Sequence, residues 1–171
     1  HWGMDTLVFE DNDSDVSCLL WTDKAQDTGQ GIDMIKNIEN VVTFNGNDKI
    51  SGNGANNIIN SGRGNDQING NDGDDLIFAG SGFDLISGGN GQDTFVVELS
   101  SESTHYRITD FSLADKIVVT SEYHLEMRNM WYGKELVISS DTGNATLELR
   151  NFREDDVDIE IDPLAMLEFA I

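Results

Sequence analysis

Apolar side chains recur every nine residues through the middle of the chain, at Ile50, Ile59, Ile68, Ile77, Ile86 and Phe95. Two positions before each stands a short polar residue, in the series Asp48, Asn57, Asp66, Asp75, Asp84 and Asp93. Four positions before each stands a small residue, in the series Gly46, Ala55, Gly64, Gly73, Gly82 and Gly91. A period that is kept six times predicts a repeat architecture.

Each unit of nine divides into a polar turn and a short strand. In the clearest unit the turn is Gly88-Gly89-Asn90-Gly91-Gln92-Asp93 and the strand is Thr94-Phe95-Val96. Glycine allows the backbone of a tight turn, and a three-residue strand directs its middle side chain to one face. Two units then make one coil, so turns 18 residues apart stack at about 4.8 Å. We therefore expect an all-β, right-handed parallel β-roll (solenoid) of about three coils.

Stacking would place carboxylates above one another in two columns. Asp48, Asp66 and Asp84 form one column, and Asn57, Asp75 and Asp93 form the other. Carboxylates at that spacing repel by about 3–4 kcal/mol per pair at an effective dielectric near 20, so the columns need cations. Carboxylate and carbonyl oxygens suit Ca²⁺ better than Mg²⁺, and metal binding at sites that exist only in the fold drives folding.

Composition narrows the possible partners. The 171 residues make about one domain, and 32 Asp and Glu against 10 Lys and Arg give a net charge of -22. That charge argues against nucleic acid and anionic membranes as partners. No apolar stretch is long enough for a transmembrane segment, and the N-terminus lacks a signal-peptide pattern. The single cysteine, Cys18, is expected to be a buried apolar thiol.

The turns resemble the RTX (repeat-in-toxin) family of calcium-binding β-rolls, whose unit is Gly-Gly-x-Gly-x-Asp-x-apolar-x. The segments Asn37–Val41, Ile108–Phe111 and Asp115–Ile117 are similar to the C-terminal domain of serralysin-type proteases and other type I secreted proteins. The resemblance implies a module of a larger protein, secreted or at the cell surface of a Gram-negative bacterium. Its implied partners are calcium, the type I secretion machinery and an adjoining domain of the parent protein.

The resemblance also implies a ligand pattern. Each calcium ion lies between turns 18 residues apart and takes carbonyls from turn positions two and four of the earlier turn, positions one and three of the later turn, and both Asp side chains. Asp48 and Asp66 would use Phe44, Gly46, Ser61 and Arg63; Asp66 and Asp84 would use Gly62, Gly64, Ala79 and Ser81. Asp75 and Asp93 would use Asn71, Gly73, Gly88 and Asn90; Asn57 and Asp75 would use Asn53, Ala55, Gly70 and Asp72.

Further residues complete the predicted set. Gly80, Gly82, Gly89 and Gly91 belong to the same turns, and Asp110 and Asp115 resemble family residues that close the last site. Asn57 and Ala55 depart from the pattern, so we expect that site to be weaker. The resemblance implies about four to six calcium ions.

The flanks are expected to cap the roll. Residues 1–42 would be N-terminal capping strands, with strands at 6–9 and 16–21 as a hairpin-like pair around Asp11–Asp15. Residues 43–96 would be the roll, 97–156 antiparallel capping strands, and 157–171 either a terminal strand or a type I secretion signal ending in Glu168–Ile171. The acidic loop fails as an EF-hand because Val16 and Thr22 stand where Gly and Glu are needed, which favours a solvated turn over an incidental calcium site.

No pattern of catalytic residues is present in the sequence. It lacks His-Glu-x-x-His, Gly-x-Ser-x-Gly and a Walker lysine, and His105 and His124 have no neighbouring ligand residues. We expect a non-catalytic module, with any activity of the parent protein outside this chain. The alternative is an adhesin or ligand-binding module in which Trp131 and Tyr132 bind a glycan or peptide.

Overall fold

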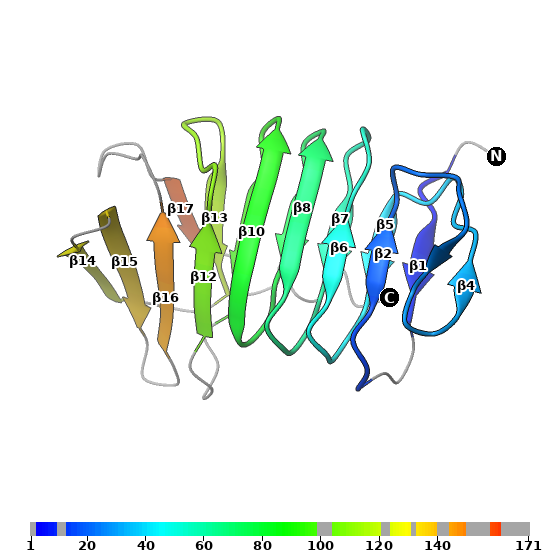
Figure 1. The fold of residues 1–171 in the computed structure, drawn as a ribbon. Coiled ribbons are helices and arrows are strands. Elements are labelled where there is room, and N and C mark those ends of the chain that lie inside the picture. Colours follow the sequence, from blue (N-terminus) through cyan, green and yellow to red (C-terminus); the bar gives the residue numbers. More distant parts are fainter. Residues whose placement is uncertain are drawn as a thin grey trace.

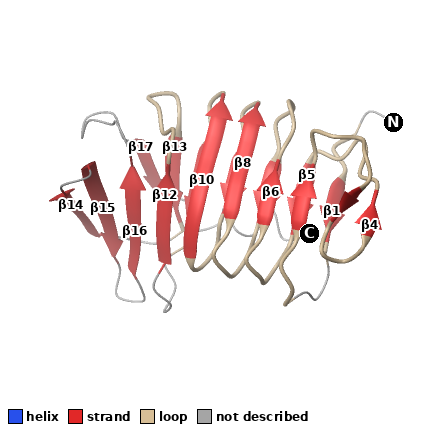
Figure 2. Cartoon of the chain, viewed as in Figure 1, coloured by secondary structure: helices blue, strands red, loops and turns tan. Residues whose placement is uncertain are grey.

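The computed structural model describes residues 3–9, 13–98, 104–120, 124–130, 133–139, 144–149 and 158–161. The predicted all-β class is confirmed, because every helix or strand assigned among these residues is a strand (Figures 1 and 2). The described residues contain no helix long and apolar enough to cross a membrane. Trp131, Tyr132, Asp11, Asn12 and residues 162–171 lie outside the described part.

The chain alternates between two long sheets that run along the molecule (Figure 1). The first sheet has the order β1 (Thr6–Val8), β5 (Asn40–Val42), β7 (Ile58–Asn60), β9 (Leu76–Phe78), β11 (Thr94–Val97), β13 (Lys116–Val119) and β17 (Asp158–Ile161). The second has the order β14 (His124–Met130), β15 (Gly133–Ser139), β16 (Asn144–Leu149), β12 (Thr104–Ile108), β10 (Phe83–Asn90), β8 (Gln67–Asp72), β6 (Lys49–Ser51) and β2 (Ser17–Leu19).

The period-nine apolar residues form the core between the sheets. Ile50 pairs with Ile68 and Ile68 with Ile86 in one sheet, while Ile59 pairs with Ile77 and Ile77 with Phe95 in the other. All six side chains are at most 3% exposed. The predicted register of the repeats is therefore confirmed.

The roll extends beyond the repeats at its C-terminal end. Strands β12 and β13 continue the two sheets in parallel, 22 residues after their partners, as Ile86 beside Ile108 and Phe95 beside Ile117 show. Strands β16 and β17 add one more parallel strand to each sheet. Only β14, β15 and β16 form the predicted antiparallel cap. The sequence did not predict this continuation because the offset changes from 18 to 22 residues. The alternation of buried and outward side chains in Tyr106-Arg107-Ile108 is the signal that indicates it.

The prediction of an N-terminal hairpin-like pair is wrong. Strand β1 pairs in parallel with β5, and β2 pairs in parallel with β6 in the opposite sheet. This arrangement lets Leu7 and Cys18 extend the two apolar columns over the open end of the roll. The antiparallel pair in this region is instead formed by β3 (Gln26–Asp27) and β4 (Ile32–Asp33). Cys18 is fully buried, as predicted.

Candidate metal centre

The acidic columns lie in the turns along the two edges of the roll. We call Asp48, Asp66 and Asp84 the first ladder, and Asn57, Asp75 and Asp93 the second ladder. All six are at most 2% exposed. In the first ladder the backbone N–H of each rung donates to Oδ1 of the next, with Asp48 N 2.8 Å from Asp66 Oδ1 and Asp66 N 3.0 Å from Asp84 Oδ1.

The second ladder is built in the same way. Asn57 N lies 2.8 Å from Asp75 Oδ1, and Asp75 N lies 3.0 Å from Asp93 Oδ1. The structure therefore brings the six predicted rungs together, 18 residues apart, along two edges. One carboxylate oxygen of Asp66, Asp75, Asp84 and Asp93 is satisfied by the rung that precedes it.

The other oxygen is not satisfied. Oδ2 is buried and has no hydrogen-bond partner in Asp48, Asp66, Asp75, Asp84 and Asp93. Burial, with a smaller contribution from neighbouring Asp residues, raises the pKa of Asp66, Asp75 and Asp93 to about 6 and that of Asp84 to about 7, although backbone hydrogen bonds lower it in part. Burial also raises the pKa of Asp48. Unpartnered buried anions are unfavourable, so this donor set fits a cation.

Backbone carbonyls converge on the same places. A Cβ built on Gly70 would lie 2.0 Å from Asp75 Oδ2 and 2.4 Å from the carbonyl oxygen of Gly88. The side-chain oxygen and the carbonyl of the next turn thus face one small volume, which any side chain at residue 70 would fill. First-position carbonyls such as that of Gly88 therefore point back toward the preceding turn.

Second- and fourth-position carbonyls point the other way. Gly62 has φ +85° and a Cβ on it would lie 1.7 Å from Phe44 O, while Gly64 has φ +135° and a Cβ on it would lie 1.6 Å from Gly46 O. Only glycine tolerates these close approaches. The third-position carbonyl of Ser81 faces back, because it accepts a hydrogen bond from Gly64 N at 2.9 Å. This is the orientation that the predicted ligand pattern requires.

The remaining predicted carbonyl donors occupy equivalent turn positions. They are Asn53, Ala55, Ser61, Arg63, Asn71, Asp72, Gly73, Ala79, Gly80, Gly82, Gly89, Asn90 and Gly91. Ala55 differs from the glycines at the fourth position of the other turns because its φ is not positive. Its carbonyl still faces the next turn, 2.5 Å from a Cβ built on Gly73. No three His, Cys, Asp or Glu side chains cluster as a metal site within the described ranges, so carbonyls are essential to any site there.

Asp115 continues the second ladder. Its Oδ1 accepts a hydrogen bond from Asp93 N at 2.9 Å, and its Oδ2 accepts one from Ser112 N at 2.7 Å. Asp110 lies beside the same turn, where Gly88 N (3.1 Å) and Gly89 N (2.9 Å) donate to its two oxygens. The structure thus places both predicted closing residues at the end of the second ladder.

The first ladder ends differently, and sequence reasoning missed the residue responsible. Tyr106 pairs with Asp84 in the strand register, at the same offset that places Asp115 beyond Asp93. The Tyr106 hydroxyl donates to Gly80 O, and His105 N donates to Gly82 O at 2.7 Å. Protein donors therefore satisfy the outward-facing carbonyls of this last turn. The ring of His105 lies 5.5 Å from that of Phe83, in a structural setting.

An additional turn precedes the first ladder. Val16 N donates to Asp48 Oδ1 at 2.8 Å, and Asn47 N donates to Asp15 Oδ1 at 2.7 Å. Asp13 and Asp15 are exposed, as expected of a solvated turn, but their turn stacks beneath residues 43–48 in register. The order Asp15-Val16-Ser17-Cys18 parallels Asn47-Asp48-Lys49-Ile50, with valine in place of the rung.

Comparison with known proteins agrees with this geometry. The family model described as RTX calcium-binding nonapeptide repeat (4 copies) matches residues 45–68 and 69–98. No curated protein matches the chain. The matched residues contain both ladders and the turns that connect their rungs. The chain therefore contains an RTX calcium-binding domain, with its repeats at residues 45–98.

Proposed function

We propose that this domain is a conditional folding module. It stays unfolded where free calcium is scarce, folds in extracellular calcium, and so supports the type I secretion, folding and stability of a larger secreted protein. The five buried Oδ2 atoms without partners carry the proposal, because the fold leaves them unsatisfied unless a cation binds. Millimolar extracellular calcium matches the affinity of such modules, about 10⁻⁴–10⁻³ M.

The ladder geometry supports five calcium ions. Two would lie in the first ladder, between Asp48 and Asp66 and between Asp66 and Asp84. Three would lie in the second, where Asp115 adds a rung beyond Asp93. The first ladder would stop at Asp84 because Tyr106, which pairs with Asp84 at the offset where Asp115 follows Asp93, brings no carboxylate. The chain's own residues would hold each ion between turns and supply no chemical step.

A circular dichroism titration tests the folding role. We expect little β-structure in EDTA and a cooperative gain as calcium rises to about 10 mM, above the range for extracellular modules. Magnesium at the same concentration serves as the control and should substitute poorly, because it requires a tighter octahedral site. An identical folded spectrum in EDTA and in calcium would refute the proposal.

The secretion role needs a separate test. Residues 158–161 form β17 in the first sheet, whereas 162–171 lie outside the described residues. We propose that the terminal segment, including Glu168–Ile171, acts as the export signal of a Gram-negative type I pathway. Deleting residues 162–171, which keeps β17, should abolish export of a fused passenger and leave calcium-induced folding intact. Normal export would refute the signal assignment, and loss of folding would identify a structural cap.

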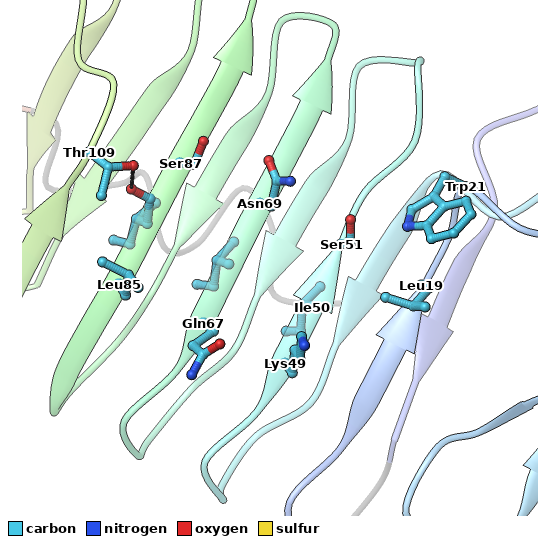
Figure 3. Close-up of a pocket in the computed structure, with 12 residues that line it drawn as sticks. Leu19, Trp21, Lys49, Ile50, Ser51, Gln67, Asn69, Leu85, Ser87 and Thr109 are labelled. Carbon is cyan, nitrogen blue, oxygen red and sulfur yellow. Dashed lines mark hydrogen bonds between the residues drawn. The ribbon is translucent and has the colours of Figure 1, made fainter.

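A second candidate function is binding of a neutral glycan, which a surface groove favours. The groove, about 480 Å³, crosses the outer face of β2, β6, β8 and β10 (Figure 3). Ser51, Asn69 and Ser87 are paired across these strands, so polar groups recur at about 4.8 Å along the groove. Trp21, 61% exposed, lies at one end and offers a stacking surface.

The charge of the groove distinguishes it from the rest of the chain. Its described lining residues include Lys49 but no Asp or Glu, although the chain has 32 acidic residues. A groove that combines apolar side chains with neutral polar groups and no carboxylate, on an acidic protein, suits a neutral polyhydroxyl ligand. Calorimetry with cellohexaose in saturating calcium should show binding that Trp21→Ala abolishes and Phe83→Ala retains, since Phe83 is exposed outside the groove. No binding across a neutral glycan array would exclude this function.

A further inference from the structure

Asn57 is the rung that departs from the family pattern, and its amide is fixed by hydrogen bonds on both sides. Its Nδ2 donates to Glu39 O at 2.7 Å and to Asn53 Oδ1 at 3.1 Å. Its Oδ1 accepts a hydrogen bond from Asn53 N at 2.8 Å. The side chain is 1% exposed, so these contacts are formed in the absence of bulk water.

The neighbour on the N-terminal side distinguishes Asn57 from the Asp rungs. Asp66, Asp75, Asp84 and Asp93 each accept an N–H from the preceding rung, and Asp48 accepts the N–H of Val16 at 2.8 Å. At Asn57 the preceding group is a carbonyl, that of Glu39. A carboxylate would place an oxygen against this carbonyl oxygen in a buried site, where the repulsion is poorly screened.

The other end of the amide keeps the arrangement of an Asp rung. A Cβ built on Gly52 would lie 2.2 Å from Asn57 Oδ1 and 2.4 Å from Gly70 O. Asp75 Oδ2 and Gly88 O face Gly70 in the same way, since they would lie 2.0 and 2.4 Å from a Cβ built on that residue. The amide oxygen thus faces the space between turns that is proposed to hold calcium, while the amide nitrogen closes the ladder.

We propose that Asn57 is the terminating rung of the second ladder: it donates a hydrogen bond away from the calcium sites and presents an oxygen toward them. The family's Asp would perform worse at this position, although it would bring an additional charge to the ion. This inference rests on the proposed calcium-dependent folding and assigns a specific role to an apparent defect in the repeat.

The test compares Asn57→Asp with Asn57→Ala in calcium titrations of the full 171-residue chain, followed by circular dichroism. Asn57→Asp should raise the calcium midpoint by at least about 1.2- to 1.7-fold, because the loss of one buried hydrogen bond is shared among five cooperatively bound ions, and at least as much as Asn57→Ala. Asn57→Asp that fails to fold while Asn57→Ala folds also supports the proposal. An unchanged or lower midpoint in Asn57→Asp, a midpoint below that of Asn57→Ala, or failure of both variants to fold would overturn it.

Asp75→Asn is the reciprocal control. Asp75 receives the N–H of Asn57, so an amide there must either lose that bond or turn its NH₂ group toward the calcium site. We expect its midpoint to rise, and a neutral effect would overturn the rule that the preceding backbone group selects the rung. If the wild-type chain does not fold in response to calcium, the proposed function fails. That result is distinct from a failure of the Asn57 proposal, which is judged only on the variants of a chain that responds to calcium.

Discussion

The two ladders are built from the same turn but begin and end against different neighbours. The first begins on the N–H of Val16 and ends beneath Tyr106, while the second begins on the carbonyl of Glu39 and extends to Asp115. Their interiors are nearly equivalent, with N–H to Oδ1 distances of 2.8–3.0 Å. The difference teaches that the repeat specifies the interior of each ladder, whereas residues outside the repeat specify how each ladder begins and ends.

The largest difference should appear between an internal rung and a terminal one. Asp75 takes part in two proposed calcium sites and Asn57 in one, so Asp75→Ala should raise the calcium midpoint far more than Asn57→Ala. We expect the calcium midpoint of Asp75→Ala to rise by about tenfold or more, since losing a charged ligand costs more free energy than losing a neutral hydrogen bond. Circular dichroism titrations of both variants measure the ratio. Equal midpoints would show that the two positions are not internal and terminal rungs of one ladder.

Glycine substitutions compare a crowded turn in the first ladder with an open turn in the second. Gly62 has φ +85° and a Cβ there would meet Phe44 O at 1.7 Å, whereas a Cβ on Gly54 would meet nothing within 4 Å. Gly62→Ala should lower stability in saturating calcium by about 1–3 kcal/mol or more, and Gly54→Ala by less than about 0.5 kcal/mol. Thermal denaturation checks both, and similar losses would contradict the close stacking of the first ladder.

The C-terminal ends of the ladders should differ in calcium number. Asp115→Ala removes a rung of the second ladder, so the variant protein should bind one calcium ion fewer than the wild type. Tyr106→Phe removes a hydroxyl donor from Gly80 O, so it should lose about 0.5–1.5 kcal/mol of stability and keep every ion. Equilibrium dialysis counts the ions, with Tyr106→Phe as the matched control. Loss of an ion in Tyr106→Phe would place calcium at the end of the first ladder.

The smallest expected difference is in pH dependence. Burial raises the pKa of Asp84 in the first ladder to about 7 and that of Asp75 and Asp93 in the second to about 6. Raised values mean that the metal-free fold gains stability from protonation, which is fully present below about pH 4 and lost as the pH rises through 6–7. In the unfolded chain these Asp residues are already ionised at about pH 6–8, so protons stabilise only the fold and act in the same direction as calcium. The calcium midpoint of folding should therefore fall as the pH falls from about 8 through 6.

Asp84→Ala separates the ladders in this experiment. Its calcium midpoint should begin to fall about one pH unit lower than that of the wild type, because the carboxyl with the higher pKa is absent. Titrations at pH 8, 7, 6 and 5.5 suffice to locate the onset. The same onset in both proteins would show that protonation of the fold does not start in the first ladder.

The interior of the roll could be predicted because its signal is local and repeated. The nine-residue period gave both the pairing of Ile50 with Ile68 and the stacking of Asp48 on Asp66. A constant offset leaves only one register in which every apolar residue faces the core. The site residue Asp115 could also be predicted from the sequence, since it resembles a family position.

The ends could not be predicted, because their partners lie at irregular distances along the chain. Cys18 pairs with Ile50 and Leu7 with Val41, across a segment that contains β3 and β4. The role of Asn57 depends on the Glu39 carbonyl, a backbone group that has no signature in the sequence. The role of Tyr106 could not be predicted, because an aromatic residue stands at the position where the repeat predicts an acidic one.

The directional N–H to Oδ1 bonds between rungs give the roll two unlike growth faces. A final turn without its flanking residues offers an unpaired N–H, and a first turn without its flanking residues offers an unpaired carboxylate oxygen. The final turn of one such truncated roll is therefore complementary to the first turn of another. Val16 and the Glu39 carbonyl occupy one face, while at the other Tyr106 follows Asp84 and the strands β14 to β16 continue the second sheet beyond β12. The flanking segments thus give each end of the roll residues that the repeat does not supply.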